Sequence, residues 1–157
     1  DALAMSFLVL KNFNTEDFAM VHPGGSLGKR LTKKTRDFAN LHQKPYVNKS
    51  TKITDVIIEI TQKRLGATAV IENNQIIGII TDGDIRRMLE KNKKFDHLIA
   101  NNIMTSEPII VSSDTLAVEA LRIMEENKIS QLIIVDENRK YLGIIHILDL
   151  IKEGITI

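Results

Sequence analysis

The feature of this sequence that most constrains its fold is an internal repeat. The stretch Gly78-Ile79-Ile80-Thr81-Asp82-Gly83-Asp84 returns as Gly143-Ile144-Ile145-His146-Ile147-Leu148-Asp149. The first and last residues of the two stretches are each 65 positions apart (143 − 78 and 149 − 84), whereas Ile53 matches Leu116 at a separation of 63 (116 − 53). We place the two extra residues of the second copy in a hairpin turn, where a length change is tolerated. The repeat predicts two copies of one structural unit.

Each copy is predicted to run in the order strand, helix, strand, strand, helix. Apolar residues at spacings of three and four predict the helices, and β-branched runs predict buried strands. The predicted elements of the first copy are a strand at 46–47, a helix at 51–65, strands at 67–72 and 75–81 joined by Asn73-Asn74, and a helix at 85–91. Those of the second copy are a strand at 109–111, a helix from Asp114 to Glu126, strands at 131–135 and 141–146, and a helix at 148–153 that Gly154 ends. In the second copy Asp114 is predicted to cap the first helix, whose buried face is Ala117, Ala120, Leu121 and Met124. Because one copy holds only a thin core, we expect the two sheets to stack into one pseudo-twofold domain of the α/β (α+β) class.

The remainder of the chain is predicted to be a leading segment and two linkers. We assign residues 1–31 to the leading segment, 32–44 to a linker, 45–92 to the first copy, 93–104 to a second linker and 105–157 to the second copy. Residues 1–12 are predicted to be helical, and the Pro- and Gly-rich stretch 22–28 is not expected to be regular. The basic stretch 29–36 is interpreted as a solvated linker, with attraction for phosphorylated ligands as the alternative. Because the chain starts inside a predicted helix, we expect it to be part of a longer protein.

The composition excludes several classes of function. The chain is 43% hydrophobic and 26% charged, with a net charge of +1, so nothing global argues for binding to nucleic acid or to a membrane. No apolar run approaches the roughly 20 residues of a membrane helix. The lack of Cys excludes disulfides and thiolate chemistry. We therefore expect a cytoplasmic protein.

A candidate ligand site lies where the strand at 75–81 is predicted to end. Thr81 supplies a hydroxyl, Asp82 and Asp84 supply carboxylates, and the first turn of the following helix supplies N–H groups that suit phosphate. A carboxylate at such a turn can accept hydrogen bonds from ribose hydroxyls. A metal site on Asp82 and Asp84 is the disfavoured alternative, because no third ligand lies nearby in the sequence.

The repeated motif carries a resemblance to a known family. Gly78, Thr81 and Asp84 form a Gly-x-x-Thr-x-x-Asp pattern within a doubled strand–helix–strand–strand–helix order, which resembles the CBS-domain pair, also called a Bateman module. Met104-Thr105, directly before the second copy, is also typical of that family. The resemblance covers about residues 37–157. It implies that ligands bind in clefts between the copies and that the pairs self-associate as dimers, usually as head-to-head disks.

The leading residues carry a second resemblance. The stretches Asp1-Ala2-Leu3-Ala4 and His22-Pro23-Gly24-Gly25-Ser26-Leu27-Gly28 look like the end of a sugar isomerase (SIS) domain. A SIS end followed by a CBS pair with Thr81-Asp82-Gly83-Asp84 and His146 resembles the arabinose 5-phosphate isomerases. That family interconverts D-ribulose 5-phosphate and D-arabinose 5-phosphate on the route to the Kdo sugar of lipopolysaccharide. The family is tetrameric and requires no metal cofactor.

The second resemblance implies a role for His22. Residues 1–31 would be the remnant of the SIS domain, and His22 matches a histidine at the active site of that family, where it could act as an acid or a base. The alternative is that His22 only braces the Gly-rich loop. The fragment alone is expected to be inactive, because the rest of the SIS domain is absent from it.

The first resemblance implies the ligand contacts. Asp84 and Asp149 would take ribose or sugar hydroxyls, Thr81 would lie near a phosphate, and Arg86 and Arg87 would either neutralise that phosphate or simply be solvent-exposed. The residues implied to flank the base share positions at the starts of strands or just before them: Val47, Ala67, Thr68, Ile110, Ser130 and Gln131.

The second copy departs from the family pattern. His146 stands where Thr or Ser is usual, and Leu148 stands where the first copy has Gly83. An imidazole can meet a carboxylate or a phosphate, so the departure favours a ligand other than a plain adenine nucleotide. A sugar nucleotide such as CMP-Kdo is the favoured candidate, with an adenine nucleotide as the alternative. The leading hypothesis is thus a ligand-sensing module; an oligomerisation scaffold without a ligand and an autonomous enzyme are the competing ones.

Overall fold

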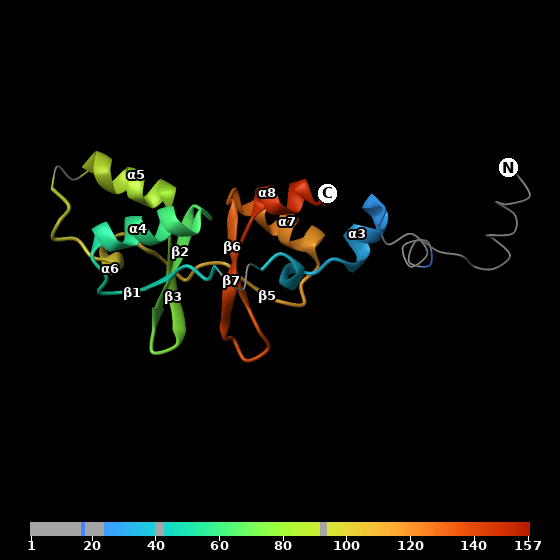
Figure 1. The fold of residues 1–157 in the computed structure, drawn as a ribbon, viewed down its shortest axis with the longest axis horizontal. Helices are drawn as coiled ribbons and strands as arrows, with labels where there is room; N and C mark the ends of the chain where they lie inside the picture. Colours follow the sequence, from blue (N-terminus) through green and yellow to red (C-terminus); the bar gives the residue numbers. More distant parts are fainter. Residues whose placement is uncertain (1–16, 18–23, 40–42, 92–93) are drawn as a thin grey trace, which may run out of the picture.

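Two similar units lie side by side in the computed structural model, which describes residues 17, 24–39, 43–91 and 94–157 (Figure 1). In each unit, helices cover one side of a small sheet and the hairpin turn projects from the opposite end. The first unit contains β1 (Tyr46–Asn48), α4 (Ile53–Lys63), β2 (Ala67–Glu72), β3 (Gln75–Thr81) and α5 (Asp82–Lys91); the second contains β5 (Ile110–Ser112), α7 (Ala117–Asn127), β6 (Gln131–Val135), β7 (Tyr141–His146) and α8 (Ile147–Lys152). The predicted element order and the mixed α and β class are confirmed.

The two sheets have the same topology. β1 pairs with β2 in parallel and β2 pairs with β3 antiparallel, just as β5 pairs with β6 and β6 with β7. A short strand between the units, β4 (Thr105–Ser106), adds an antiparallel fourth strand beside β3. Both residues of the first hairpin turn, Asn73 and Asn74, have left-handed φ angles of 50° and 60°, as a two-residue hairpin requires.

The alignment of the two copies differs from the sequence prediction by one position. α4 begins at Ile53 and α7 begins at Ala117, which are 64 positions apart (117 − 53), and each helix ends at a left-handed residue, Arg64 or Lys128. Before the hairpin the separation is therefore 64, not 63, and the second copy carries one extra turn residue instead of two. The buried helix positions Ile53, Val56 and Ile60 correspond to Ala117, Ala120 and Met124, so burial defines this alignment.

Two predicted helix starts are wrong. α5 begins at Asp82, not at residue 85, because the Asp84 carboxylate accepts hydrogen bonds from the Thr81 N–H and hydroxyl and closes the first turn. Asp114 does not cap α7, which begins after Leu116. Its carboxylate instead pairs with Lys34 and Arg36, and the hydrogen bond from Lys34 is the main cause that lowers the pKa of Asp114.

The basic segment before the first unit packs on the second unit. Residues 26–28, predicted to be irregular, begin the helix α3 (Ser26–Thr32), which is followed by the short 3-10 helix η1 (Thr35–Asp37). Thr35 is fully buried and donates its N–H to Thr115 and its hydroxyl to Ser112. This part of the chain is therefore packed and is not a solvated linker; the prediction for residues 1–12 lies outside the described residues.

The segment between the units packs on the first unit in the same way. Leu98 accepts a hydrogen bond from the Ile53 N–H, and Ala100, which begins the short helix α6 (Ala100–Ile103), donates to Thr51. Each unit is thus completed by the segment that precedes the other unit. Gly78 makes room for this path, since a Cβ there would lie 2.7 Å from the Met104 sulfur and 3.0 Å from the Thr105 carbonyl oxygen.

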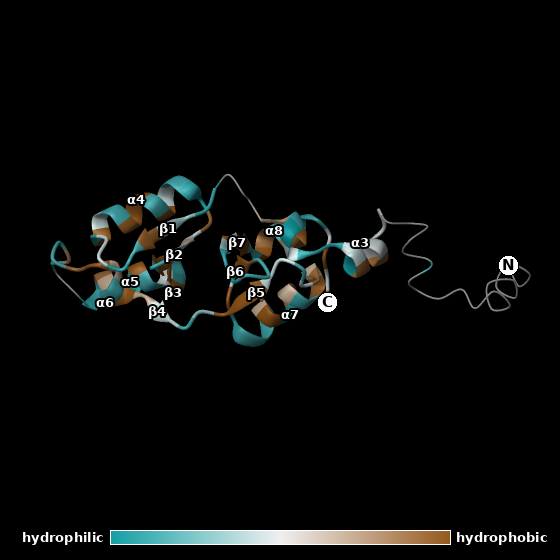
Figure 2. Ribbon diagram, turned by 90° about the horizontal axis from the view of Figure 1, so that it is seen from below, coloured by the Kyte–Doolittle hydropathy of each residue, from teal (hydrophilic) through white to brown (hydrophobic). Residues whose placement is uncertain are grey.

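The core is continuous between the two sheets. Each unit has its own cluster of buried residues under its helices, and Figure 2 shows that these helices carry both hydrophobic and hydrophilic residues. A third cluster joins the sheets and contains Ala67, Ala69, Ile133, Val135, Tyr141 and Ile144. The predicted stacking of the two sheets is confirmed.

Tyr141 provides a polar link within the cluster between the sheets. Its hydroxyl donates to the carbonyl oxygen of Pro45 at 2.8 Å, and the residue is only 9% exposed. Burial raises the pKa of Tyr141, and the charge of Glu59 adds to the shift. The neutral phenol therefore belongs to the folded state, and its hydrogen bond ties the second unit to the start of the first.

Tyr141→Phe is expected to lower the free energy of unfolding by about 1 kcal/mol, because it removes the phenol's hydrogen bond to the Pro45 carbonyl oxygen, which keeps the Ala69 N–H as a donor. Above pH 10 or so, the unfolded chain loses the tyrosine proton before the folded chain does, so stability should fall as the pH rises. The Phe variant should lack that part of the decline. Urea denaturation from pH 8 to pH 11 measures both effects, with the exposed Tyr46→Phe as control; identical pH profiles for wild type and Tyr141→Phe would contradict the assignment.

Candidate functional site

The first candidate site, cleft 1, is a cavity of about 390 Å³ between the two units. The end of β3 and the start of α5 form one wall, the segment around β4 forms another, and the turn from α7 into β6 forms the third. Its lining residues are Ile79, Thr81, Asp84, Arg87, Thr105, Glu107, Pro108, Ile109, Lys128, Ile129, Ser130 and Gln131. The cleft exists only when both units are in place.

Asp84 is a buried and hydrogen-bonded carboxylate in cleft 1. One carboxylate oxygen accepts from the Thr81 N–H at 2.8 Å and from the Thr81 hydroxyl at 2.7 Å, and the other accepts from the Arg87 guanidinium at 2.6 Å. The residue is 8% exposed. A carboxylate held by three donors is preorganised as an acceptor, and the neighbouring hydroxyl and guanidinium suit an anion.

The opposite wall of cleft 1 comes from the second unit. Ser130 is exposed, and Gln131 is partly buried, with its side-chain N–H₂ donating to the Leu65 carbonyl oxygen at 3.4 Å. That bond crosses from one unit to the other. Gln131 thus faces the cavity while it is positioned by the turn before β2.

The second candidate site, cleft 2, is the pseudo-symmetric counterpart, with a volume of about 290 Å³. Its lining residues are Arg64, Leu65, Gly66, Asp82, His146, Leu148, Asp149 and Lys152. The repeat places His146 at the position of Thr81, Asp149 at that of Asp84 and Lys152 at that of Arg87. The two clefts therefore have equivalent positions in the fold, but different residue types occupy some of these positions.

His146 performs a structural task in cleft 2. Its Nδ1 accepts a hydrogen bond from the Leu148 N–H at 3.1 Å and so caps the start of α8. No hydrogen bond is found on its other ring nitrogen within the described part of the chain. No hydrogen bond joins His146 to Asp149 among the residues that the structure describes, in contrast to the Thr81–Asp84 pair of cleft 1.

Comparison with known families decides what this doubled unit is. Residues 36–91 and 100–155 each match the model of the CBS domain. The chain belongs to the CBS domain family. It is therefore a tandem CBS pair, and clefts 1 and 2 are lined by residues of both its copies.

Relatives of known name and solved structures agree with this assignment. The chain is 40% identical, over 99% of its length, to arabinose 5-phosphate isomerase KdsD of Pseudomonas aeruginosa, and 37% identical, also over 99%, to the Escherichia coli protein of that name. It spans about half of those relatives, 48% of each. The CBS-pair protein CBSX2 of Arabidopsis thaliana aligns with a TM-score of 0.65 and 22% identity over 76% of this chain and 92% of that one. A CBS domain protein of Pyrobaculum aerophilum, solved in complex with AMP, aligns with a TM-score of 0.68 and 21% identity over 74% and 89%.

The structure brings together part of the predicted ligand set of the CBS pair. Cleft 1 gathers Thr81, Asp84, Arg87, Ser130 and Gln131, and cleft 2 gathers His146 and Asp149. The remaining predicted residues lie elsewhere. Val47, Ala67 and Thr68 are buried in the core, and Ile110 lines a third cavity. Arg86 is exposed and lines neither cleft, and His22 lies outside the described residues.

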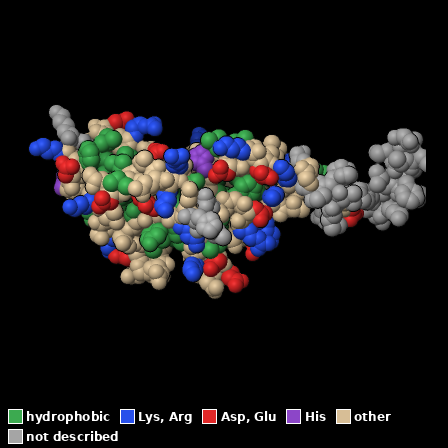
Figure 3. Space-filling model, in the orientation of Figure 1, with side chains coloured by type: hydrophobic (Ala, Val, Ile, Leu, Met, Phe, Trp, Pro, Cys, Tyr) green, Lys and Arg blue, Asp and Glu red, His purple; other side chains and the backbone are tan. Residues whose placement is uncertain are grey.

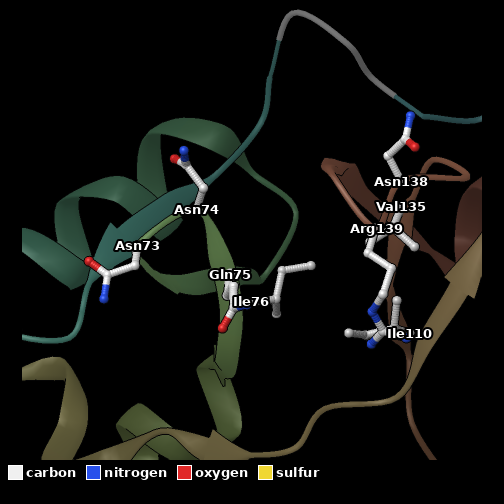
Figure 4. Close-up of a pocket in the computed structure, with 8 residues that line it drawn as sticks. All are labelled: Asn73, Asn74, Gln75, Ile76, Ile110, Val135, Asn138 and Arg139. Atoms are coloured by element: carbon white, nitrogen blue, oxygen red, sulfur yellow. The ribbon is translucent and has the colours of Figure 1, made fainter.

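The third cavity lies between the hairpin ends, away from both clefts, and has a volume of about 520 Å³ (Figure 4). Figure 4 shows the Ile76 side chain reaching into it from the first unit, and Arg139 and Ile110 facing it from the second. Asn73 and Asn74 point away from it in the same view. This cavity contains none of the hydroxyl and carboxylate groups that make the clefts candidate ligand sites.

Sequence reasoning missed several residues of the clefts. Lys128 and its counterpart Arg64 occupy the left-handed ends of α7 and α4, and Lys152 is the counterpart of Arg87. The repeat alignment itself could have identified Lys152, because 65 positions separate it from Arg87 (152 − 87). Thr105, Glu107, Pro108 and Ile109 lie just before β5, in a stretch that the repeated motif does not cover.

Asp82 and Asp84, the two carboxylates of the alternative metal site, line different cavities. Asp84 lines cleft 1 while Asp82, two residues earlier, lines cleft 2, so the two side chains diverge. No group of three or more His, Asp or Glu residues that could hold a metal ion occurs in the described part of the chain. Nor does any helix there combine the length and apolar character that crossing a membrane requires.

Proposed function

We propose that this chain is the regulatory, ligand-binding CBS pair of an arabinose 5-phosphate isomerase. The observation that carries the proposal is the Thr81–Asp84–Arg87 group in cleft 1, where a buried carboxylate, a hydroxyl and a guanidinium converge. A carboxylate suits the hydroxyls of a ribose or another sugar, and the cations suit a phosphate. The ligand is a nucleotide or a sugar nucleotide.

One comparison supports a nucleotide ligand, and another supports the parent enzyme. Solved CBS pairs of the same fold are described as complexes with AMP, although their identity to this chain is only about one fifth. Several relatives that match nearly the whole chain are named arabinose 5-phosphate isomerase. We propose CMP-Kdo, a sugar acid nucleotide, as the pathway-specific ligand. A molecule of it in cleft 1 would offer an anion and several hydroxyls, and a molecule in cleft 2 would offer its carboxylate to His146.

Calorimetric titration of the chain with AMP and with CMP-Kdo tests this function. We expect saturable heat for at least one of them and a rise in melting temperature, since a ligand at 100 times its Kd stabilises the folded state by about 2.7 kcal/mol. No heat and no thermal shift from either ligand at millimolar concentration would contradict the proposal. That result would favour the alternative, a CBS pair that acts only as an oligomerisation scaffold.

The parent enzyme is proposed to interconvert D-ribulose 5-phosphate and D-arabinose 5-phosphate in the cytoplasm, as a homotetramer without a metal cofactor. We propose that residues 1–31 end its SIS domain and that His22 acts there as an acid or base. The 157-residue chain alone should be inactive toward ribulose 5-phosphate in a coupled assay. Turnover by the chain alone would instead make it an autonomous enzyme.

Self-association of the pair is proposed to use the helical side. Large apolar side chains are exposed there: Ile58 on α4, Leu89 on α5, and Leu148 and Ile151 on α8. Figure 3 shows hydrophobic side chains gathered over these helices. A surface of this kind buries apolar area when a second copy covers it.

Ile151→Glu is therefore expected to weaken the dimer at least about tenfold, because burial of one Ile side chain is worth about 1.5–3 kcal/mol. Sedimentation velocity over a concentration series measures the dissociation constant. Leu31→Glu on α3, at a residue 38% exposed, is the matched control and should leave the dimer intact. A dimer of unchanged affinity in Ile151→Glu would place the interface elsewhere.

A further inference from the structure

Arg87 occupies an unusual place at cleft 1. Its guanidinium donates to Asp84 at 2.6 Å, yet the Arg87 side chain is 62% exposed while the Asp84 side chain is only 9% exposed. A Cβ placed on Gly83 would lie 3.4 Å from one terminal nitrogen of Arg87 and 3.5 Å from the Thr81 hydroxyl. The guanidinium therefore lies back over the first turn of α5 and covers the carboxylate from the solvent side.

Arg87 also borders a second cavity. It lines cleft 1 and, together with Asp84, a neighbouring cavity of about 320 Å³ between α5 and α6. A side chain that lines both has open space on either side. It can therefore leave Asp84 without displacing any packed element of the fold.

The second copy lacks this arrangement. Lys152 stands at the position of Arg87 and lines cleft 2, but within the described residues it makes no ion pair with Asp149. Lys has a single compact charge and cannot form the directed fork of a guanidinium. The Asp–Arg pair is therefore a property of cleft 1 and does not follow from the shared fold.

The ion pair sets a condition on any ligand that uses Asp84. Three of the roughly four acceptor positions of the carboxylate are already occupied, two by Thr81 and one by Arg87, so a ligand that places two hydroxyls on Asp84 must displace one donor. Arg87 is the exposed donor of the two residues, and once displaced its guanidinium needs a new acceptor. A neutral ligand supplies none, whereas a ligand with an anion beside its hydroxyls supplies one. We propose that Arg87 is a specificity-determining residue of cleft 1. Its ion pair with Asp84 disfavours the binding of neutral nucleosides and allows their phosphorylated forms to bind, because a phosphate supplies the guanidinium with a new acceptor.

This inference rests on the proposed function, since it assumes that cleft 1 takes a nucleotide. Its test is the affinity of adenosine and of AMP, measured by calorimetry on wild type and on Arg87→Ala. Wild type should bind AMP about 10- to 100-fold more tightly than adenosine. In Arg87→Ala, AMP should bind about tenfold more weakly and adenosine severalfold more tightly, so that the two affinities converge.

Arg86→Ala, at the exposed neighbour on the same helix, is the matched control and should keep the wild-type ratio. A loss of structure would weaken the binding of both ligands together. Opposite changes in the two affinities therefore distinguish the proposed role of Arg87 from a folding defect. Equal changes for both ligands in Arg87→Ala, or no change, would overturn the inference and leave nucleotide binding intact. If wild type binds neither ligand, the inference fails together with the adenine-nucleotide form of the proposed function.

Discussion

Asp84→Ala is expected to lower the affinity of the chain for AMP about 100-fold. The substitution removes the acceptor for the ligand hydroxyls, and hydrogen bonds to a charged group contribute about 1.5–3 kcal/mol. It also leaves the Thr81 hydroxyl and the Arg87 guanidinium without the partner that positions them. Calorimetry of wild type and variant measures the change.

Asp55→Ala is the matched control, because Asp55 is an exposed carboxylate in the first turn of α4 and lines neither cleft. It should bind AMP as wild type does. The same calorimetric measurement on Asp149→Ala shows whether cleft 2 contributes to AMP binding. The Asp84 variant should also lose about 1 kcal/mol of stability with its helix-start bonds, as urea denaturation will show. An Asp84→Ala chain that binds AMP with unchanged affinity would remove cleft 1 from consideration.

Ile144→Ala is expected to lower the free energy of unfolding by about 3–4 kcal/mol. Ile144 is 1% exposed and packs in the cluster that joins the two sheets. Truncation of a buried Ile loses its transfer free energy and leaves a cavity. Because the total stability of a domain is about 5–15 kcal/mol, the change is large enough to shift the urea midpoint clearly.

Ile58→Ala provides the contrast, since Ile58 is 51% exposed on α4. It should change the stability of the monomer by less than about 0.5 kcal/mol. If Ile144→Ala cost no more than Ile58→Ala, the stacked sheets would contribute little to the fold, and the shared clefts would lose their structural basis.

Local patterns predicted the secondary structure well. The buried face of α7 matches its prediction residue by residue, because helical periodicity and burial are both read from spacings of three and four. Gly154 ends α8 with a φ of +82°, as its position after the last apolar residue indicated. The predicted cap of α7 failed because its side chain makes a non-local bond, whereas the start of α5 was missed through the local Thr81–Asp84 bonds. The position of Asp114 before a helix predicts a helix cap, but its hydrogen-bond partners Lys34 and Arg36 lie about 80 residues away in the sequence.

The candidate site was predictable only in part, for the same reason. Thr81, Asp84 and Arg87 come from one strand–helix junction, so the sequence already holds them together. The other wall of cleft 1 comes from the opposite copy, and predicted residues such as Ala67 and Thr68 are instead fully buried and do not line the cleft. Strand starts predict proximity to a cleft, but the way the sheets stack decides which side chains face it.

The sequence by itself determined the repeat, the order of the elements and hence the family of the fold, because hydrophobic spacing and turn residues act over a few positions. Only the tertiary structure decided that each unit is completed by the segment preceding the other, and that Arg87 covers Asp84 in one cleft while its counterpart leaves Asp149 uncovered. Those features depend on contacts between residues far apart in the chain, which arise only when the two sheets stack.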